Sequence, residues 1–512
     1  MKSFVFTVLS VAGLAVLSLP AAETSSVYRV DFSSPAVKQA VRRCPYARIE
    51  KDLEHTDVLI VEVPESAGNS VSAMVDIPVN LAKNGMAGKM IYGEAYLENE
   101  NVKKPTKSYL GIKFMLPYNS PSQGRSYPEF LTPKQKYGTA PWRKFGSMIQ
   151  IPSDVRLGHL TLGLQNTTGK VSFKNICLYP GSAMPRSIFT LKEVPRAVYT
   201  VNPPRQRGAM CPAKPVEKNF ADLKKMGGNS MRWIANVNAK EATLPAIRTA
   251  MERHLANLDQ ALELAEKYGI MLTIDLHANR NSGAVLLGTP AGRDAVVDFW
   301  KRAAAKCRGK SAVFGYDLLN EPHTSCLKHD DPLLAAQYDR IIREIRAIDP
   351  VTPIIVESDY MSHPDTLQYL PVFPYENIIY SVHVYAPMEL THQLNPKLAS
   401  YNGYPDAARK WEKEYLRKFL VPVKKFQEKT GARIYIGEFG CIRWAPGADR
   451  WLRDCIELFE EYGWDWAYHA FREWQGWSVE HSDDPGNMAP VEMTARKQAI
   501  LDGFKRNQEK EK

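Results

Sequence analysis

The sequence predicts an α/β protein, in which a C-terminal (β/α)8 TIM barrel follows an N-terminal all-β sandwich of the jelly-roll type. Two observations lead to this prediction. Residues 27–180 contain short runs of alternating apolar and polar residues, rich in β-branched and aromatic side chains and separated by polar turns. After Pro185, short apolar runs alternate with amphipathic stretches of roughly 10–20 residues, which is typical of repeated β-α units around a parallel sheet.

The first part contains seven expected strands, at residues 27–32, 58–63, 72–79, 90–97, 109–116, 159–166 and 170–179. Long polar loops are expected near 99–107 and 118–140, and few stretches have a helical period. The closing segment, residues 161–181, resembles the last strands of jelly-roll carbohydrate-binding modules. We therefore expect a carbohydrate-binding-like module over residues 23–185. Its candidate stacking aromatics are Trp142, Tyr92, Tyr96 and Tyr118, although aromatics of this kind more often pack in a core or at its rim.

The second part, residues 190–508, contains strands expected at 230–237, 270–277, 313–320, 353–358, 378–385, 433–439 and 464–471. Helices are expected at 257–269, 293–306, 332–348, 406–431 and 449–463. Gly269, Gly431 and Gly463 each end one of these helices just before a strand. An open doubly wound sheet has the same rhythm, but no G-x-G-x-x-G motif follows a first strand, so a dinucleotide-binding fold lacks support.

Residues 1–22 have the features of a secretory signal peptide. Lys2 supplies a positive start, residues 4–19 are apolar, and Pro20-Ala21-Ala22 gives an exit of small residues. The apolar run is shorter than the roughly 20 residues that a membrane span needs. We therefore expect an exported protein, secreted or periplasmic, without a transmembrane segment. The seven cysteines are expected to be buried, with one or two disulfide bridges at most.

The net charge of +10 is concentrated in the first part of the chain. Residues 24–190 hold 21 Lys and Arg against 13 Asp and Glu, a charge of +8, whereas residues 191–512 hold 44 against 42. The basic residues are spread thinly and not interleaved with aromatics, so nucleic acid is not an expected partner. Contact of the sandwich with an anionic glycan or a cell surface is the remaining interpretation. The oligomeric state is left open.

Polar residues end several apolar strands of the second part. In a barrel, the carboxyl ends of the strands converge on one cavity, where the active site lies. Buried polar groups there must bond one another, because leaving them unpaired costs several kcal/mol. These residues are Arg232, His277, Asn320-Glu321-Pro322, His383, Tyr385 and Glu438.

These motifs strongly resemble glycoside hydrolase family 5. The resemblance rests on Asn320-Glu321-Pro322 after YDLL, His383-x-Tyr385 after YSV, and Glu438 in IYIGEFG. It implies a retaining glycosidase without metal or cofactor, with β-glucan the first substrate class and β-mannan the second. Glu321 would be the general acid/base, which must hold a proton, and Glu438 the ionised nucleophile.

By the same resemblance, the remaining residues support the reaction. Arg232 and the Tyr385 hydroxyl would donate to the nucleophile, His277 would bind the sugar, and Asn320 would bond its 2-hydroxyl. His469 stands where the family usually has a tryptophan after the last strand, so either the register differs or Trp474 stacks on the sugar. A catalytically altered carbohydrate-binding protein and a transglycosylase on the same fold remain alternatives.

Overall fold

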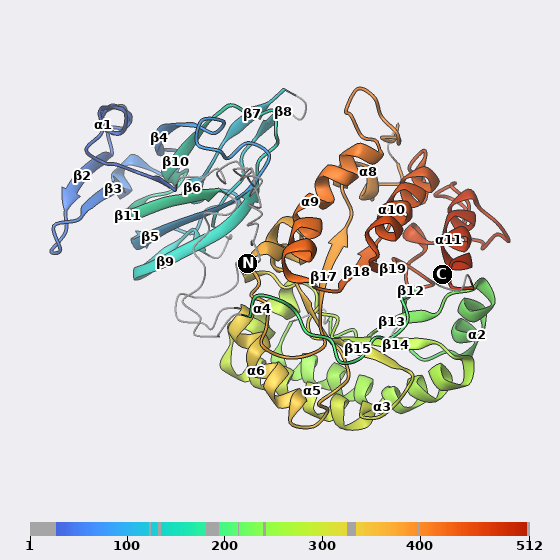
Figure 1. Cartoon of the computed structure of the whole chain (residues 1–512). Helices are drawn as coiled ribbons and strands as arrows, with labels where there is room; N and C mark the ends of the chain where they lie inside the picture. Colours follow the sequence, from blue (N-terminus) through green and yellow to red (C-terminus); the bar gives the residue numbers. More distant parts are fainter. Residues whose placement is uncertain are drawn as a thin grey trace, which may run out of the picture.

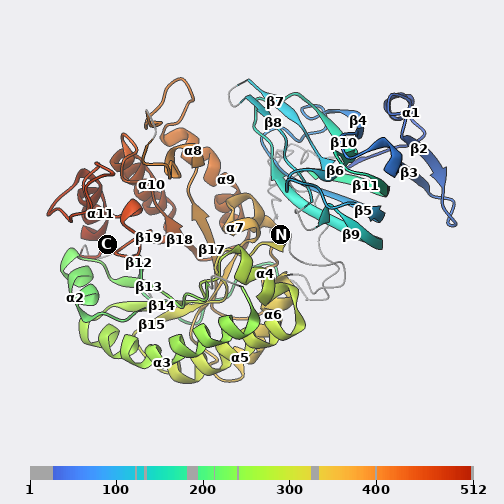
Figure 2. The same ribbon diagram turned by 180° about the vertical axis from the view of Figure 1, so that it is seen from behind.

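The computed structural model describes residues 27–508, except 122–123, 132–134, 181–193, 213, 239–241, 325–333 and 398–399. The expected signal peptide therefore lies outside the described residues. An antiparallel sandwich and a barrel with separate hydrophobic cores stand side by side (Figures 1 and 2). Within the described residues, no helix has the length and apolar character that a membrane crossing needs.

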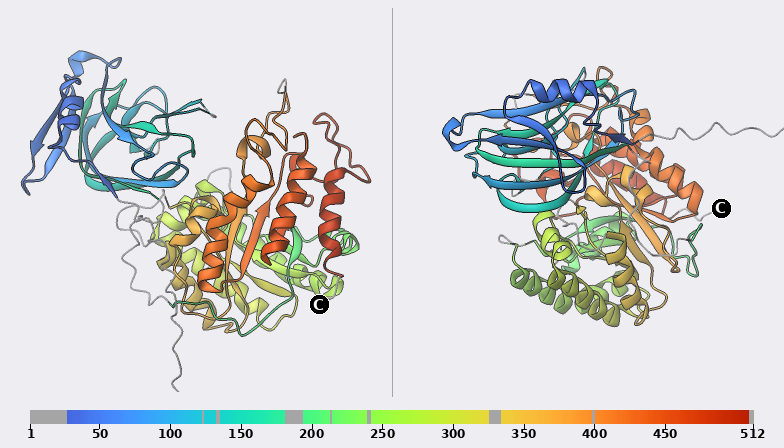
Figure 3. Two further views of the ribbon diagram at one scale, coloured as in Figure 1. Left: turned by 45° about the horizontal axis from the view of Figure 1, so that its top comes forward. Right: turned by 90° about the vertical axis from the view of Figure 1, so that its left-hand side faces the viewer.

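The sandwich consists of two antiparallel sheets (Figure 3). One has the order β2-β3-β11-β5-β9 with β1 beside β11, and the other the order β4-β10-β7-β8 with β6 beside β10. In β4 buried and more exposed residues alternate, so one face lies on the core. The strand bounds are β1 (Tyr28–Arg29), β2 (Ala47–Lys51), β3 (Asp57–Val63), β4 (Ser72–Asn80), β5 (Met90–Val102), β6 (Gly111–Met115), β7 (Tyr118–Ser120), β8 (Gly124–Ser126), β9 (Gly138–Gln150), β10 (Leu157–Gln165) and β11 (Gly169–Pro180).

Several elements of the sandwich differ from the sequence prediction. Helix α1 (Pro35–Arg42) was not expected; the Ser34 hydroxyl caps it and Pro35 begins it. Strand β9, of 13 residues, begins at the end of the segment predicted as a loop. It pairs along β5 with two register shifts, and such irregular pairing weakens the alternation that sequence reading depends on.

The barrel is closed by eight parallel strands in chain order, from β12 to β19. The sequence prediction missed β12, a short strand with no polar residue at its end. Most of these strands are buried along their whole length, as expected when helices cover the outside. Their bounds are β12 (Arg207–Cys211), β13 (Ser230–Ile234), β14 (Met271–Asp275), β15 (Val313–Asp317), β16 (Ile354–Glu357), β17 (Ile378–Val384), β18 (Ile434–Phe439) and β19 (Asp465–Tyr468).

Helices surround the barrel, and local signals set their ends. Thr243 caps α3, and Gly269 ends it in the left-handed conformation with φ +60. The helix bounds are α2 (Glu217–Met226), α3 (Leu244–Tyr268), α4 (Arg280–Gly288), α5 (Pro290–Cys307), α6 (Leu334–Arg346), α7 (Asp359–Ser362), α8 (Met388–Thr391), α9 (Lys413–Thr430), α10 (Ala448–Tyr462) and α11 (Ala495–Lys505).

Apolar side chains fill the barrel interior below the predicted site, and the cysteines form no bridge in the described part of the chain. The interior cluster is Phe314, Ile355, Ile379, Tyr435 and Ala467. Six cysteines are buried, as the sequence analysis expected, and none of these six forms a disulfide bridge. The seventh, Cys326, lies outside the described residues.

Candidate active site

The predicted polar residues lie at the carboxyl ends of the barrel strands. Arg232 is within β13 and Glu438 within β18, whereas Tyr385 and His469 directly follow β17 and β19. His277, Asn320 and Glu321 come two to four residues after β14 or β15. The closed strand order brings them together in one network of contacts.

Arg232 is the central cation of the site, and its side chain is fully buried. Its guanidinium donates to Glu438 Oε1 at 2.7 Å, to Asp317 Oδ2 at 2.9 Å and to Glu357 Oε1 at 2.8 Å. Asp275 Oδ1 lies 3.2 Å from Nη2. Burial opposes the charge, but the four carboxylates outweigh it and hold the pKa of Arg232 well above its ordinary value.

Glu438 is a buried carboxylate surrounded by donors. Arg232 Nη1 donates to Oε1 and the Tyr385 hydroxyl to Oε2, each at 2.7 Å. The Nδ1 atoms of His469 and His383 lie 3.4 and 3.6 Å from Oε2. Burial by itself would raise the pKa of Glu438, but His383, His469 and Arg232 outweigh it and hold that pKa well below its usual range. Glu438 is therefore ionised, as a nucleophile must be.

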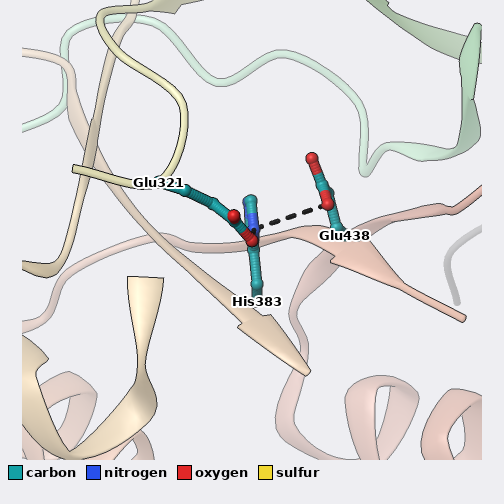
Figure 4. A group of neighbouring side chains, drawn as sticks. All are labelled: Glu321, His383 and Glu438. Carbon is teal, nitrogen blue, oxygen red and sulfur yellow. Dashed lines mark hydrogen bonds and ion pairs between the residues drawn. The ribbon is translucent and has the colours of Figure 1, made fainter. Parts of the chain in front are cut away.

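Glu321 faces Glu438 across the imidazole of His383 (Figure 4). His383 Nδ1 is 3.0 Å from Glu321 Oε1, and the Glu321 side chain is 31% exposed, whereas that of Glu438 is 4% exposed. One carboxylate oxygen of each glutamate and one ring nitrogen of His383 all lie within 4.8 Å of one another. The Glu321 carboxyl is therefore open to a ligand from solvent, whereas the Glu438 carboxyl is buried beneath it.

Two carboxylates and one imidazole can in other settings hold a metal ion. Here Glu357 Oε1 lies 3.3 Å from Nε2 of His383. Burial opposes the imidazolium, but Glu357 and Glu438 raise the pKa of His383 well above its ordinary value. A protonated imidazole is no ligand, and the Arg232 cation is already paired with Glu438. This donor set fits acid–base chemistry better than metal binding.

His277 and Asn320 are held by the same network. His277 Nδ1 bonds Asp275 Oδ2 at 2.8 Å, which leaves Nε2 as the ring atom to meet a ligand. Asn320 accepts from Arg232 Nη2 at 3.1 Å and donates to the Ala278 carbonyl at 3.3 Å. Both side chains are thus fixed in orientation before any sugar arrives.

His469 lies beside Tyr385 and Glu473 at the end of β19. Its Nδ1 is 2.6 Å from the Tyr385 hydroxyl, and its Nε2 is 2.6 Å from Glu473 Oε2. The aromatic that packs against it is Trp477, with ring centroids 4.7 Å apart. Trp474 packs on Trp477 from outside and stays 44% exposed, so it is available at the rim of the site.

Glu357 is a residue of the site to which the sequence analysis assigned no role. The structure places it at the end of β16, fully buried and bonded to Arg232. Its signal was the same as that of Glu438, a glutamate that ends an apolar strand. Glu473, in the loop after β19, is a second residue that the sequence analysis did not assign, and it bonds His469.

Comparison with known proteins adds an independent finding. The model of a family described as cellulase, glycosyl hydrolase family 5, matches residues 200–479. Endoglucanase C of Acetivibrio thermocellus is 28% identical over 246 residues, which is 41% of this chain and 71% of that protein. Cellodextrinase A of Ruminococcus flavefaciens is 23% identical over 233 residues, or 42% of this chain and 67% of that protein. The cellulose synthase subunit Z of Clostridioides difficile, a solved structure, has a TM-score of 0.47 at 20% identity and covers 59% of this chain and 99% of its own.

Proposed function

Since the chain belongs to the cellulase family, glycosyl hydrolase family 5, we propose that it cleaves a cellulose-like β-glucan by double displacement, with retention of configuration. That it is a glycosidase of polysaccharides follows from the family and from its endoglucanase relatives. The observation that carries retention is the spacing of Glu321 and Glu438, whose nearest oxygens lie within 4.8 Å. Retaining enzymes place these groups about 5–5.5 Å apart, and inverting ones about 6.5–9.5 Å apart.

In the first step, the Glu438 carboxylate attacks the anomeric carbon while the Glu321 carboxylic acid gives its proton to the departing glycosidic oxygen. The bond between that carbon and oxygen breaks as the ester bond to Glu438 forms. Arg232 and Tyr385, each 2.7 Å from the nucleophile, fix its orientation. In the second step, Glu321 takes a proton from water, whose oxygen displaces Glu438 from the sugar.

His277, Asn320 and Trp474 are proposed as the substrate-binding residues around this centre. His277 Nε2 and the Asn320 side chain would bond hydroxyls of the sugar at the cleavage point, with Asn320 on the 2-hydroxyl. Trp474, 44% exposed at the rim, would stack on a neighbouring sugar ring. His469 takes the place of the usual tryptophan and acts on Tyr385 and Glu438 instead of forming an apolar floor.

The test is product analysis on cellulose-derived oligosaccharides, with β-mannan and xylan oligosaccharides in parallel. The first product, observed by proton NMR before mutarotation, should be the β-anomer. Glu438→Ala and Glu321→Ala should each lower kcat by at least about a hundredfold. With a dinitrophenyl β-cellobioside, whose leaving group departs without protonation, azide should restore turnover in both variants, giving the α-glycosyl azide with Glu438→Ala and the β-glycosyl azide with Glu321→Ala.

The matched control is Glu344→Gln, an exposed glutamate on α6 that pairs with Lys301; its kcat should equal that of the unaltered protein. An α-anomer as first product would contradict retention. Full activity of Glu438→Ala would contradict the assignment of the nucleophile. Products longer than the substrate would indicate transglycosylation, and tight binding without turnover would indicate a carbohydrate-binding protein.

We also propose export of the protein and glycan contact by the sandwich. The pattern of residues 1–22 supports export, and the charge of +8 over residues 24–190 supports contact with anionic glycans. Two sandwich tyrosines, Tyr109 and Tyr127, are 55% and 53% exposed. Binding of full-length Glu438→Ala to sulfated glycan beads should fall steeply with salt. Equal retention at low and high salt would contradict an electrostatic contact.

A further inference from the structure

Glu357 connects the two halves of the active site. Its Oε1 accepts from Arg232 Nη2 at 2.8 Å and lies 3.3 Å from Nε2 of His383. Its Oε2 accepts from the backbone N–H of Glu321 at 2.7 Å and from the Ser362 hydroxyl. A fully buried carboxylate with four partners is satisfied at both oxygens, so it is held in a single orientation.

The contact with the main chain of Glu321 matters because that residue has a left-handed backbone. Its φ is +46, a region that costs a non-glycine residue roughly 1–3 kcal/mol. The conformation persists only if surrounding groups impose it. The 2.7 Å bond from Glu321 N–H to Glu357 is a charge-assisted bond at this residue. It fixes the direction in which the Glu321 side chain leaves the strand end.

The contact of Glu357 with His383 acts on the side-chain carboxyl of Glu321. Because Nε2 of His383 faces Glu357, its Nδ1 faces Glu321 at 3.0 Å and Glu438 at 3.6 Å. The ion pair of the His383 ring with Glu357, at 3.3 Å, favours this one orientation of the ring. Glu357 therefore positions Glu321 in two ways. It bonds the backbone N–H of Glu321, and it orients the His383 imidazole that contacts the Glu321 carboxyl.

We propose that Glu357 is a positioning residue for the acid step, which acts through Glu321 and His383 and not only as a counter-charge to Arg232. The proposal rests on the proposed retaining cleavage of β-glucan. It implies that the loss of Glu357 impairs proton delivery to the leaving oxygen more than it impairs attack by Glu438. A merely structural carboxylate would impair both to the same degree.

Aryl β-cellobiosides separate these two effects. A dinitrophenyl leaving group departs without protonation, whereas a phenyl group needs the proton of Glu321. Glu357→Gln should lower kcat/KM on the phenyl glycoside by about a hundredfold, and on the dinitrophenyl glycoside by less than about tenfold. The basic limb of the pH profile for the phenyl glycoside should also shift, because the environment of the acid has changed.

Asp317→Asn is the matched control. Asp317 is another fully buried partner of Arg232, at 2.9 Å, and among the described residues its hydrogen bonds reach neither Glu321 nor His383. Its substitution should lower kcat/KM by the same factor on both glycosides. Equal factors for Glu357→Gln on the two glycosides would overturn the proposal.

Two further measurements keep the test decisive. If Glu357→Gln does not fold, Ser362→Ala removes one of the four partners of Glu357. It should show the same dependence on the leaving group, with a smaller loss of kcat/KM. A loss that is independent of the leaving group would refute the proposal. An unaltered protein inactive on every aryl cellobioside would refute the proposed substrate instead. The same comparison would then use the glycoside that the oligosaccharide panel identifies.

Discussion

His469 makes the stability of the barrel depend on pH in a calculable way. Its ring lies 3.4 Å from Glu438 Oε2 and 2.6 Å from Glu473 Oε2. Burial alone would lower the pKa of His469, but the two carboxylates outweigh it and raise the pKa to about 9. At neutral pH the imidazolium therefore donates Nδ1–H to the Tyr385 oxygen, and Tyr385 in turn donates to Glu438.

The size of the effect follows from the difference between the pKa of His469 in the folded protein, about 9, and the pKa of about 6.5 in an unfolded chain. This difference corresponds to about 3 kcal/mol of free energy of unfolding. Because the pKa is raised in the folded state, the contribution is complete below about pH 6.5 and is lost as the pH rises through about 9. Replacing His469 by Gln, which bonds but carries no charge, should remove this contribution.

This contribution can be measured by urea unfolding of the unaltered protein and of His469→Gln, from about pH 6 to about pH 10. All tryptophans except Trp142 lie beyond the sandwich, so their fluorescence reports the barrel in particular. The stability gap between the two proteins should be about 3 kcal/mol larger at the acidic end. Glu473→Gln is the matched variant and should reduce the pH dependence without abolishing it. Parallel curves for the unaltered protein and His469→Gln would refute the reasoning.

Two other substitutions test the rim and the base of the barrel. Trp474→Ala should raise KM for long oligosaccharides about three- to tenfold with kcat unchanged, because only a stacking contact at the rim is lost; an unchanged KM would remove Trp474 from the binding site. Glu460→Ala should lower the free energy of unfolding by about 3 kcal/mol. It removes the carboxylate that Arg207 bonds at 2.8 and 2.9 Å and leaves this largely buried cation with only the Asn507 side chain as a neutral acceptor. Glu460 pairs with Arg207, the first residue of β12, at the end of the barrel opposite to Glu438. Substitution of Glu460 should therefore leave the kcat of the folded protein unchanged. A loss of kcat would contradict this placement.

Part of the site could be predicted because it depends on residues that are close together in the sequence. Glu321 and Glu438 are polar residues that end apolar strands, and a barrel brings such residues together. Glu357 has the same local pattern, but its role depends on His383 and on the backbone of Glu321, which no local pattern encodes. The identity of His469 as a partner of Glu438 was likewise open, because the loop after β19 offered Trp474 as another choice.

The sequence by itself determined the class of most barrel strands and of the longer helices, and it showed that polar residues stand at several strand ends. Hydrophobic period and caps act within a few residues, so β13 to β19 and the helices α3, α5, α6, α9 and α10 could be located. The irregularly paired β9, the short β12 and helices such as α2 and α11 could not. Only the tertiary structure decided which charges meet. Arg232 binds carboxylates from four other strands, one of them 206 residues away, and barrel closure alone sets those distances. The pKa values follow from these distances and from burial, which is why the chemistry of the two glutamates is a property of the folded barrel.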